Sequence, residues 1–312
     1  MQGSNDRFRV VSLFCGAGGL DLGFEQAGFE ILWSNDIDPD ACSTHRLWSK
    51  ATVVCKDVKN LNPNEIPVCD VVIGGFPCQG FSHAHIRKVD DERNVLYKFF
   101  VKVISERKPK VFVAENVKGI LTLDKGRVIR TILNDFTLAG YKVTANLVNA
   151  ADYGVPQDRE RVFLIGFRND FPTNWRFPAP SLKKVTIREA LKNVPSPLPE
   201  EICQAAYSSM FKSRNRRRGW DDQSYTIPAM AKQTPLHPSS PRMIKISENQ
   251  WIFGVGKTRR LSWKEAAAIQ TFPLDMEFIG NLTSIYRQIG NAVPVKLAKV
   301  IALSIKPYLR DD

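Results

Sequence analysis

The chain has 312 residues, 43% of them hydrophobic and 10% aromatic, so it can bury a core and is not a disordered chain. Its 44 lysines and arginines exceed its 32 aspartates and glutamates, which gives a formal net charge of +12. This surplus indicates a polyanionic partner, and nucleic acid is the first candidate. Residues 205–265 hold 12 basic and 4 acidic side chains, a net +8, so most of the surplus lies in one short segment.

Membrane and secreted classes are not indicated. No apolar run approaches the ~20 residues that cross a bilayer, and residues 1–9 lack the apolar core of a signal peptide. The six cysteines form no C-x-x-C pair and no zinc-type cluster. We therefore expect a reduced cytoplasmic protein with mostly buried, inert thiols.

Hydrophobic periodicity predicts alternating strands and helices over the first 170 residues. Strands are expected at residues 9–14, 30–34, 52–55, 70–73, 110–114, 141–148 and 161–167, and helices at 20–27, 39–48, 93–107 and 128–139. This alternation predicts an α/β fold with a doubly wound, largely parallel sheet covered by helices on both faces.

After about residue 169 the regular pattern is lost. Prolines interrupt it at positions 172, 178, 180, 195, 197 and 199, and helical spacing returns only at residues 262–271 and 295–305. An irregular, basic segment of this kind is typical of a separate recognition domain.

A glycine-rich turn, Phe-Cys-Gly-Ala-Gly-Gly at residues 14–19, follows the first expected strand. Glycines there let the backbone approach a ligand closely, but Asp21 stands where the dinucleotide fingerprint needs its third glycine. The turn therefore suits a nucleoside ligand without phosphates, such as S-adenosylmethionine. Asp36 and Asp57 end the next two strands, where each could bind the ligand or merely cap a turn, as we expect of Asp38.

A second glycine-rich loop, residues 74–82, carries Cys78 directly after Pro77. A thiol in that setting is unlike a buried core cysteine. His83 and His85 lack further ligands, so they make a poor metal site and we expect no metal.

Charged groups stand beside two further strands: Glu115 ends one, and the run at residues 157–161 precedes the other. Glu115 would face the same cleft as Cys78 from the neighbouring strand, and Arg159 and Arg161 would bring two guanidinium groups towards it. Salt bridges alone would also account for this charged run.

In this order the motifs resemble those of bacterial-type DNA (cytosine-5)-methyltransferases of restriction-modification systems, over almost the whole chain. The matching positions are residues 14–19, Asp36, Asp57, Pro-Cys-Gln at 77–79, Glu-Asn-Val at 115–117, 157–161, Arg-Leu-Ser at 260–262, Glu265, Gln-Thr-Phe-Pro at 270–273 and Gly-Asn-Ala-Val-Pro at 290–294. Two positions depart: Asp36 replaces a common glutamate, and Ile37 replaces an aromatic residue that often lies against the adenine. A Cys-Phe-Thr pattern of related tRNA enzymes is not found, which favours DNA over RNA.

The resemblance implies a Rossmann-like, S-adenosylmethionine-dependent catalytic domain at residues 1–180 plus 280–312 and a smaller target-recognition domain at 181–279. It implies that Cys78 adds to C6 of a flipped-out cytosine, that Glu115 binds the N3 and amino edge, and that Arg161, with Arg159, binds the O2 side. The methyl group then goes to C5. No residue is assigned as the base that removes the C5 proton.

Residue by residue, the resemblance implies a cofactor site made of Phe14, Gly16, Gly19, Asp36, Ile37, Asp57, Val58, Pro77, Leu96, Asn291, Ala292 and Val293. The expected DNA contacts are Ser82, Arg87, Arg214, Arg216, Arg218, Thr226 and Lys232. The segment from Arg214 onwards resembles the recognition domains of methyltransferases acting on short GC-rich palindromes such as GGCC. Its arginines would bind phosphates or guanine edges, two alternatives that the sequence leaves open.

The partner expected is double-stranded DNA, bound by a monomer in the cytoplasm of a bacterium or archaeon and associated with the nucleoid when on DNA. The sequence leaves open whether there is a cognate restriction endonuclease, which would act on the same site without necessarily being bound; no membrane is involved. Two other functions stay open at this point: an RNA cytosine-5 methyltransferase, and a DNA-binding protein on an inactive methyltransferase scaffold.

Overall fold

The computed structural model describes residues 7–77, 95–171 and 174–310. The chain divides into two compact units. The first comprises Met1–Val148, Glu160–Ala179 and Ala298–Asp312, and the second comprises Asn149–Arg159 and Pro180–Leu297.

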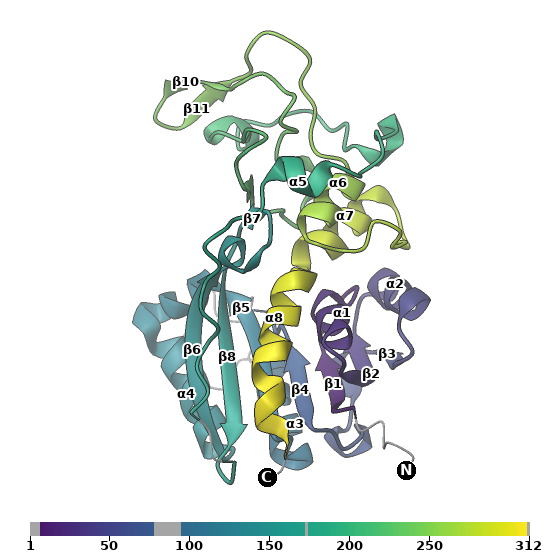
Figure 1. The fold of residues 1–312 in the computed structure, drawn as a ribbon, viewed down its shortest axis with the longest axis vertical. Coiled ribbons are helices and arrows are strands. Elements are labelled where there is room, and N and C mark those ends of the chain that lie inside the picture. The colour runs from purple at the N-terminus through teal and green to yellow at the C-terminus, as the bar shows by residue number, and fades with distance from the viewer. Residues whose placement is uncertain (1–6, 78–94, 172–173, 311–312) are drawn as a thin grey trace. The chain divides into compact units, whose positions relative to one another are not determined.

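The first unit contains a seven-stranded sheet in the order β3-β2-β1-β4-β5-β8-β6 (Figure 1). Its strands are β1 (Arg9–Leu13), β2 (Glu30–Asp36), β3 (Thr52–Cys55), β4 (Val71–Gly74), β5 (Val111–Val117), β6 (Tyr141–Asn149) and β8 (Glu160–Arg168). The first five run parallel, and β8 pairs with β5 in the antiparallel direction. Almost every residue of β1, β4 and β5 is buried, as expected of strands covered on both faces. The predicted α/β fold with a largely parallel sheet is confirmed.

Helices cover this sheet: α1 (Gly19–Gln26), α2 (Pro39–Trp48), α3 (Val95–Arg107), α4 (Arg127–Leu138) and the part of α8 (Val295–Ile305) that starts at Ala298. On one face, Phe100 of α3 and Phe136 of α4 pack against Phe112 of β5 in one continuous core. In Figure 1, α8 lies across the face of the sheet turned towards the viewer. No helix of the described residues is both long and apolar enough to cross a bilayer.

The second unit is built mainly from irregular chain. It contains α5 (Ile187–Leu191), α6 (Trp263–Ile269), α7 (Leu282–Asn291), the parallel pair β7 (Gln157–Asp158) and β9 (Ser224–Tyr225), and the antiparallel pair β10 (Ile244–Ser247) and β11 (Gln250–Ile252). Between residues 180 and 262 the longest regular element is α5, with five residues. The predicted irregular segment is therefore confirmed, whereas α7 was not expected from the sequence.

Short 3-10 helices complete the described chain. They lie at Val58–Asn60, Pro63–Glu65, Lys118–Leu121, Leu123–Gly126, Ala150–Tyr153, Pro199–Glu201, Phe211–Ser213, Ala231–Gln233 and Lys306–Leu309.

Two segments expected in the catalytic domain belong instead to the second compact unit. These are residues 149–159 and 280–297. The reason is local: Arg159 and Gln270 both bind backbone carbonyls at the end of α7. The domain bounds inferred from the resemblance stay a prediction.

Candidate active site

The candidate residues of the first unit gather at one edge of its sheet. The parallel strands β3, β2, β1, β4 and β5 are adjacent, so their carboxyl ends share that edge. The glycine turn follows β1, Asp36 ends β2, residues 75–77 follow β4, and Glu115 lies near the end of β5. Ligands of open α/β sheets bind at this edge.

The glycine turn has the conformation that its residues require. Gly16 and Gly18 have φ values of 55° and 87°, in the left-handed region that glycine adopts without strain, and Phe14, with φ 56°, adopts the same region although it carries a side chain. Among the described residues, no atom lies within 4 Å of the point where a Cβ of Gly16 would stand. The turn therefore leaves open space beside its backbone, as a bound nucleoside needs.

Asp36 is tied to this turn. Its Oδ2 accepts a hydrogen bond from the Gly16 amide at 2.7 Å, and its Oδ1 accepts one from the Asp38 amide at 2.9 Å. Burial raises the pKa of Asp36, while these amides act in the opposite direction. Next to it, the apolar side chain of Ile37 is 64% exposed. A carboxylate beside an open turn and an exposed apolar side chain fit a ribose and an adenine.

The other cofactor candidates of the first unit differ in what they offer. Asp57 caps the following 3-10 turn, because its side chain accepts the Lys59 amide at 3.0 Å, and Val58 is buried in the core. Pro77 is exposed, and Phe14 and Leu96 are partly buried against the core. Gly19 begins α1.

Glu115 and Arg161 form an ion pair, with Arg161 Nε 2.9 Å from Glu115 Oε1. The antiparallel register places Phe163 opposite Glu115 and Arg161 opposite Val117, so the pair lies diagonally on one face of two adjacent strands. Both side chains are largely buried, with 14% and 11% exposure for Arg161 and Glu115. Burial lowers the pKa of Arg161, and Glu115 opposes this shift.

The end of β4 is held against this pair. A Cβ on Gly75 would lie 3.0 Å from Glu115 Oε2, so glycine permits the close approach of the two strands. Asn116 Nδ2 also donates to the Phe76 carbonyl at 2.8 Å. The described chain thus leads past the Glu115 carboxylate to Pro77. Cys78, Ser82 and Arg87, together with His83 and His85, lie outside the described residues.

Arg159 belongs to the second unit and is 1% exposed. Its guanidinium donates to the carbonyls of Ile227 at 3.2 Å and of Gly290 and Ala292 at 3.0 Å each. A cation that binds the last carbonyls of α7 stabilises the end of that helix. These contacts give Arg159 a structural role, and its catalytic role stays a prediction.

The cofactor candidates near the C-terminus, residues 291–293, lie at the end of α7. Asn291 is its last residue and is exposed, Ala292 follows in extended conformation, and Val293 is buried. The preceding Gly290 is required by packing, because a Cβ there would lie 2.3 Å from the Pro228 backbone.

The expected DNA-contacting arginines are not equivalent. Arg216 is 6% exposed and donates to the carbonyls of Phe211 and Met210 and to Gln233 Oε1. Burial lowers its pKa to about 10. Arg218 pairs with Asp158 at 3.2 Å, and its guanidinium lies 4.3 Å from the centre of the Tyr225 ring.

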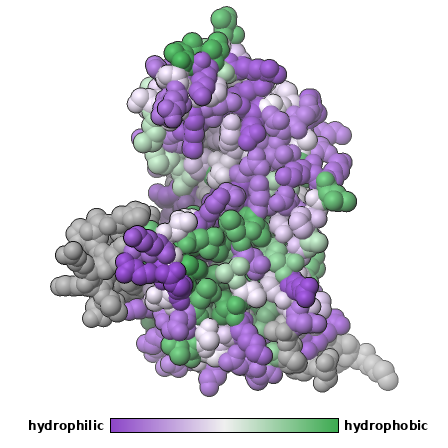
Figure 2. Space-filling view, turned by 90° about the vertical axis from the view of Figure 1, so that its left-hand side faces the viewer, coloured by the Kyte–Doolittle hydropathy of each residue, from purple (hydrophilic) through white to green (hydrophobic). Residues whose placement is uncertain are grey.

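The remaining candidates for DNA contact also differ in whether their side chains are already hydrogen-bonded within the protein. Thr226 Oγ1 donates to the Asp158 carbonyl at 2.7 Å. In contrast, Arg214 and Lys232 have exposed side chains, for which the described residues provide no hydrogen bond or ion pair. Figure 2 shows that hydrophilic side chains cover most of the visible surface of the second unit, with apolar side chains gathered at the tip that carries β10 and β11. The exposed cations are therefore the ones able to meet phosphates.

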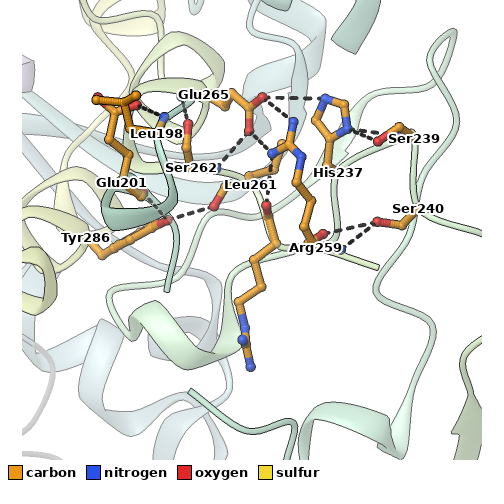
Figure 3. A network of polar contacts seen from close by, with 11 residues as sticks. Leu198, Glu201, His237, Ser239, Ser240, Arg259, Leu261, Ser262, Glu265 and Tyr286 are labelled. Carbon is orange, nitrogen blue, oxygen red and sulfur yellow. Dashed lines mark hydrogen bonds and ion pairs between the residues drawn. The ribbon is translucent and has the colours of Figure 1, made fainter. Parts of the chain in front are cut away.

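A polar network that sequence reasoning did not predict lies in the second unit (Figure 3). Glu265 accepts two hydrogen bonds from Arg259 at 2.7 and 2.8 Å, lies 3.5 Å from His237 Nε2, and forms a capping box with Ser262 at the start of α6. Burial lowers the pKa of His237 to about 4. Ser262 and Glu265, spaced as a capping box, were the sequence signal for part of this network.

Comparison with known proteins identifies the family. The model of the C-5 cytosine-specific DNA methylase family matches residues 8–307. The type II methyltransferase M.BspRI of Lysinibacillus sphaericus is 43% identical over 360 aligned positions, covering 100% of this chain and 84% of that protein. M.BsuRI of Bacillus subtilis is 41% identical, covering 96% of this chain and 79% of that protein.

A solved structure agrees at the level of the fold. The Entamoeba histolytica methyltransferase EhMeth superposes with a TM-score of 0.74 at 17% identity, covering 98% of this chain and 100% of that one. With the family match over nearly the full length, the RNA enzyme and the inactive scaffold are set aside. The chain belongs to the C-5 cytosine-specific DNA methylase family and is a restriction-modification DNA (cytosine-5)-methyltransferase that uses S-adenosylmethionine.

Proposed function

We propose that the enzyme methylates C5 of a cytosine that is flipped out of a short, specific duplex sequence, through a covalent bond between Cys78 and C6. The observation that carries this proposal is the buried Glu115–Arg161 pair at the strand edge, against which Gly75 packs three residues before Cys78. Stacked bases hide C6, so the target base must leave the duplex.

In this mechanism the Cys78 thiolate adds to C6, and the electron pair of the C5–C6 bond becomes available at C5. Glu115 binds the N3 and amino edge of the base, and Arg161 binds its O2 side, so both groups stabilise the charge of the adduct. When bound, S-adenosylmethionine would supply an electrophilic methyl group to C5 and leave as S-adenosylhomocysteine. Loss of the C5 proton to a base and departure of the Cys78 sulfur then restore the aromatic ring.

The cofactor position that fits best is the edge formed by Gly16, Asp36 and Ile37. In the open turn, Gly16 and Gly19 pass close to the methionine portion, and Phe14 lies against the adenine. Asp36 holds the ribose, and Ile37 takes the place of an aromatic residue against the adenine. The remaining contacts proposed are Asp57, Val58, Pro77, Leu96, Asn291, Ala292 and Val293.

For DNA binding, we propose that the second unit contains the target-recognition domain. Arg214 and Lys232 are the exposed candidates, whereas Arg216, Arg218 and Thr226 hold the local fold in the free protein. Ser82 and Arg87 complete the proposed set. A GC-rich palindrome is the proposed target, methylated by a cytoplasmic monomer to protect the site from a cognate endonuclease.

A mechanism-based trap tests the covalent step. DNA in which 5-fluorocytosine replaces cytosine keeps fluorine at C5, so elimination is blocked and the enzyme should remain bound in the presence of S-adenosylmethionine. The complex should survive denaturing electrophoresis for the unaltered chain and be absent for Cys78→Ser. No adduct, or an adduct unaffected by that substitution, would refute the mechanism. Bisulfite sequencing of DNA from expressing cells then reports the target sequence.

A further inference from the structure

A buried polar cluster lies behind the glycine turn, apart from the groups proposed to act on the base. It consists of Ser12 in β1, Asp21 in α1, Ser34 in β2 and His45 in α2, all with 0% exposure. The Asp21 carboxylate accepts hydrogen bonds from Ser12 Oγ at 2.6 Å, Ser34 Oγ at 2.9 Å and His45 Nε2 at 2.9 Å. Since a carboxylate only accepts, Nε2 carries the proton, and one side chain joins two strands to α2.

The same histidine supports the turn from behind. A Cβ on Gly18 would lie 2.5 Å from His45 Cδ2 and 2.2 Å from Trp48 Cζ2, so these two rings fill the space beside Gly18. Trp48 Nε1 also donates to the Ala17 carbonyl at 3.1 Å, and the two rings pack with centroids 4.6 Å apart. Helix α2 therefore holds the left-handed turn through one hydrogen bond and two ring contacts.

On its other side the turn presents the groups proposed to meet the cofactor. The Gly16 amide is fixed to Asp36 Oδ2 at 2.7 Å, and the space beside the Gly16 Cα is open among the described residues. A tilt of His45 would move Gly18 and Ala17, and through them the position of Gly16 relative to Asp36. The contacts thus run without a gap from Asp21 to the proposed cofactor site.

Metal binding and core stability account for the cluster less well. Cys15 Sγ lies within 4.8 Å of the ligand atoms of Asp21 and His45, which are metal-ligand types. However, the Asp21 carboxylate is already used by three donors, and burial together with Asp21 raises the pKa of the Cys15 thiol, which disfavours the thiolate that binds metal. Core stability alone would not favour His45 at this position, because its Nδ1 is buried without a hydrogen-bond partner among the described residues.

We propose that His45, oriented by Asp21, is a positioning residue for S-adenosylmethionine: it fixes the turn at residues 16–18 so that Gly16 and Asp36 are arranged for the cofactor. This inference rests on the proposed placement of the cofactor beside Gly16. It assigns His45 no contact with the reacting atoms.

Two substitutions of His45 by side chains of equal length distinguish a positioning role from a packing role. His45→Gln keeps a donor near the position of Nε2, whereas His45→Met fills similar space without a donor. For His45→Met we expect the Kd of S-adenosylhomocysteine, measured calorimetrically on the protein without DNA, to rise roughly tenfold, since a hydrogen bond to a buried charge is lost. The KM for S-adenosylmethionine should rise in parallel, while kcat and the KM for DNA change little. His45→Gln should restore most of the affinity.

Control variants distinguish a general loss of stability, a failure of the inference about His45 and a failure of the proposed cofactor placement. Phe136→Leu in α4 lowers the Tm through the core without touching the turn, and it should leave the cofactor Kd unchanged. If His45→Met lowers the Tm but not the affinity, the inference is overturned, provided that Asp36→Ala weakens binding. If Asp36→Ala also binds normally, the proposed cofactor placement itself fails.

A second variant covers the case in which His45→Met does not fold. Trp48→Phe keeps a ring beside Gly18 but removes the donor to the Ala17 carbonyl. We expect it to raise the cofactor Kd and KM with kcat retained. An unchanged Kd for folded Trp48→Phe would equally overturn the inference.

Discussion

Glu115 and Arg161 act as one unit because each satisfies the other in a largely buried position. An isolated carboxylate there would be destabilised by burial, and the ion pair with Arg161 offsets that cost at the strand edge. The pair is also rigid, since both side chains stand on paired strands. A preorganised charge of this kind is what a developing adduct requires.

Glu115→Gln should therefore lower kcat by about 10²–10³-fold, because the amide removes the charge that stabilises the adduct. Transfer of labelled methyl groups to DNA measures this loss. The matched control is Glu160→Gln, which removes an exposed carboxylate from the neighbouring strand β8 that pairs with Lys118. The control should keep its activity, and equal activity of both variants would contradict the proposed role of Glu115.

Arg216 and Arg214 illustrate how two neighbouring arginines differ in their surroundings. Arg216→Ala should destabilise the protein by about 2–4 kcal/mol, because two carbonyls and Gln233 lose their donor in a buried position. Arg214→Ala should leave stability within about 0.5 kcal/mol. It should instead weaken DNA binding and reduce the salt slope by about 1. Denaturant unfolding and salt titrations of binding measure both, and the reverse pattern would contradict this division.

At the scale of elements, helix ends organise the second unit. Glu265 caps α6 and binds Arg259, while Arg159 binds the carbonyls at the end of α7. Both ends belong to positions matched by the family motifs. The side chains of Glu265 and Arg159 form their hydrogen bonds and ion pairs within this unit. These contacts stabilise a segment that has little regular secondary structure.

His237 makes this network pH-sensitive. Burial lowers its pKa to about 4, so the folded state holds a neutral ring while the unfolded state takes up a proton below pH ~6.5. The contribution of the neutral His237 ring to the free energy of unfolding is then fully present above pH 6.5. It is lost as the pH falls towards 4, by up to about 1.4 kcal/mol per pH unit. His237→Gln should be less stable than the unaltered protein at pH 8, with a difference that shrinks below pH 6.5.

Chemical denaturation across this pH range checks the prediction. Ser239→Ala is the control, because it removes a hydrogen-bond partner of the ring at 2.6 Å and keeps the imidazole. It should retain the pH slope. If the free energy of unfolding of His237→Gln and of the unaltered protein changed in parallel with pH, a group other than His237 would be responsible for the pH dependence.

At the scale of the whole molecule, charge and chemistry are separated along the chain. Residues 205–265 carry a net +8, while residues 1–204 carry +3 with 27 basic and 24 acidic side chains. A local basic surplus raises the affinity for phosphates through the release of counterions. We therefore expect residues 205–265 to supply most of the electrostatic attraction for DNA.

Neutralising exposed cations should show this asymmetry. Lys232→Gln with Lys257→Gln in the basic segment should reduce the slope of log K against log salt by about 1.8 if both contact phosphates. Lys102→Gln with Lys142→Gln removes the same charge from the first unit and should change the slope far less. Cofactor affinity should be unchanged in both pairs. Equal slopes would place the DNA-binding surface elsewhere.

The sequence by itself determined the order of strands and helices in the first unit and the candidate chemistry. Parallel strands buried on both faces appear as short apolar runs, so β1, β4 and β5 were located to within about three residues. The motifs at Gly16, Asp36 and Glu115 were placed at strand ends for the same local reason. Motif spacing is a property of the chain and needs no three-dimensional information.

Only the tertiary structure decided what each polar side chain does. Arg159 and Arg161 are two residues apart, yet one binds the end of α7 and the other pairs with Glu115. Arg216 is buried while Arg214 is exposed, and His45 meets Asp21 across 24 residues of sequence. A charged side chain can satisfy its hydrogen bonds with solvent, a ligand or distant backbone, and the choice depends on burial, which the packing of remote segments sets.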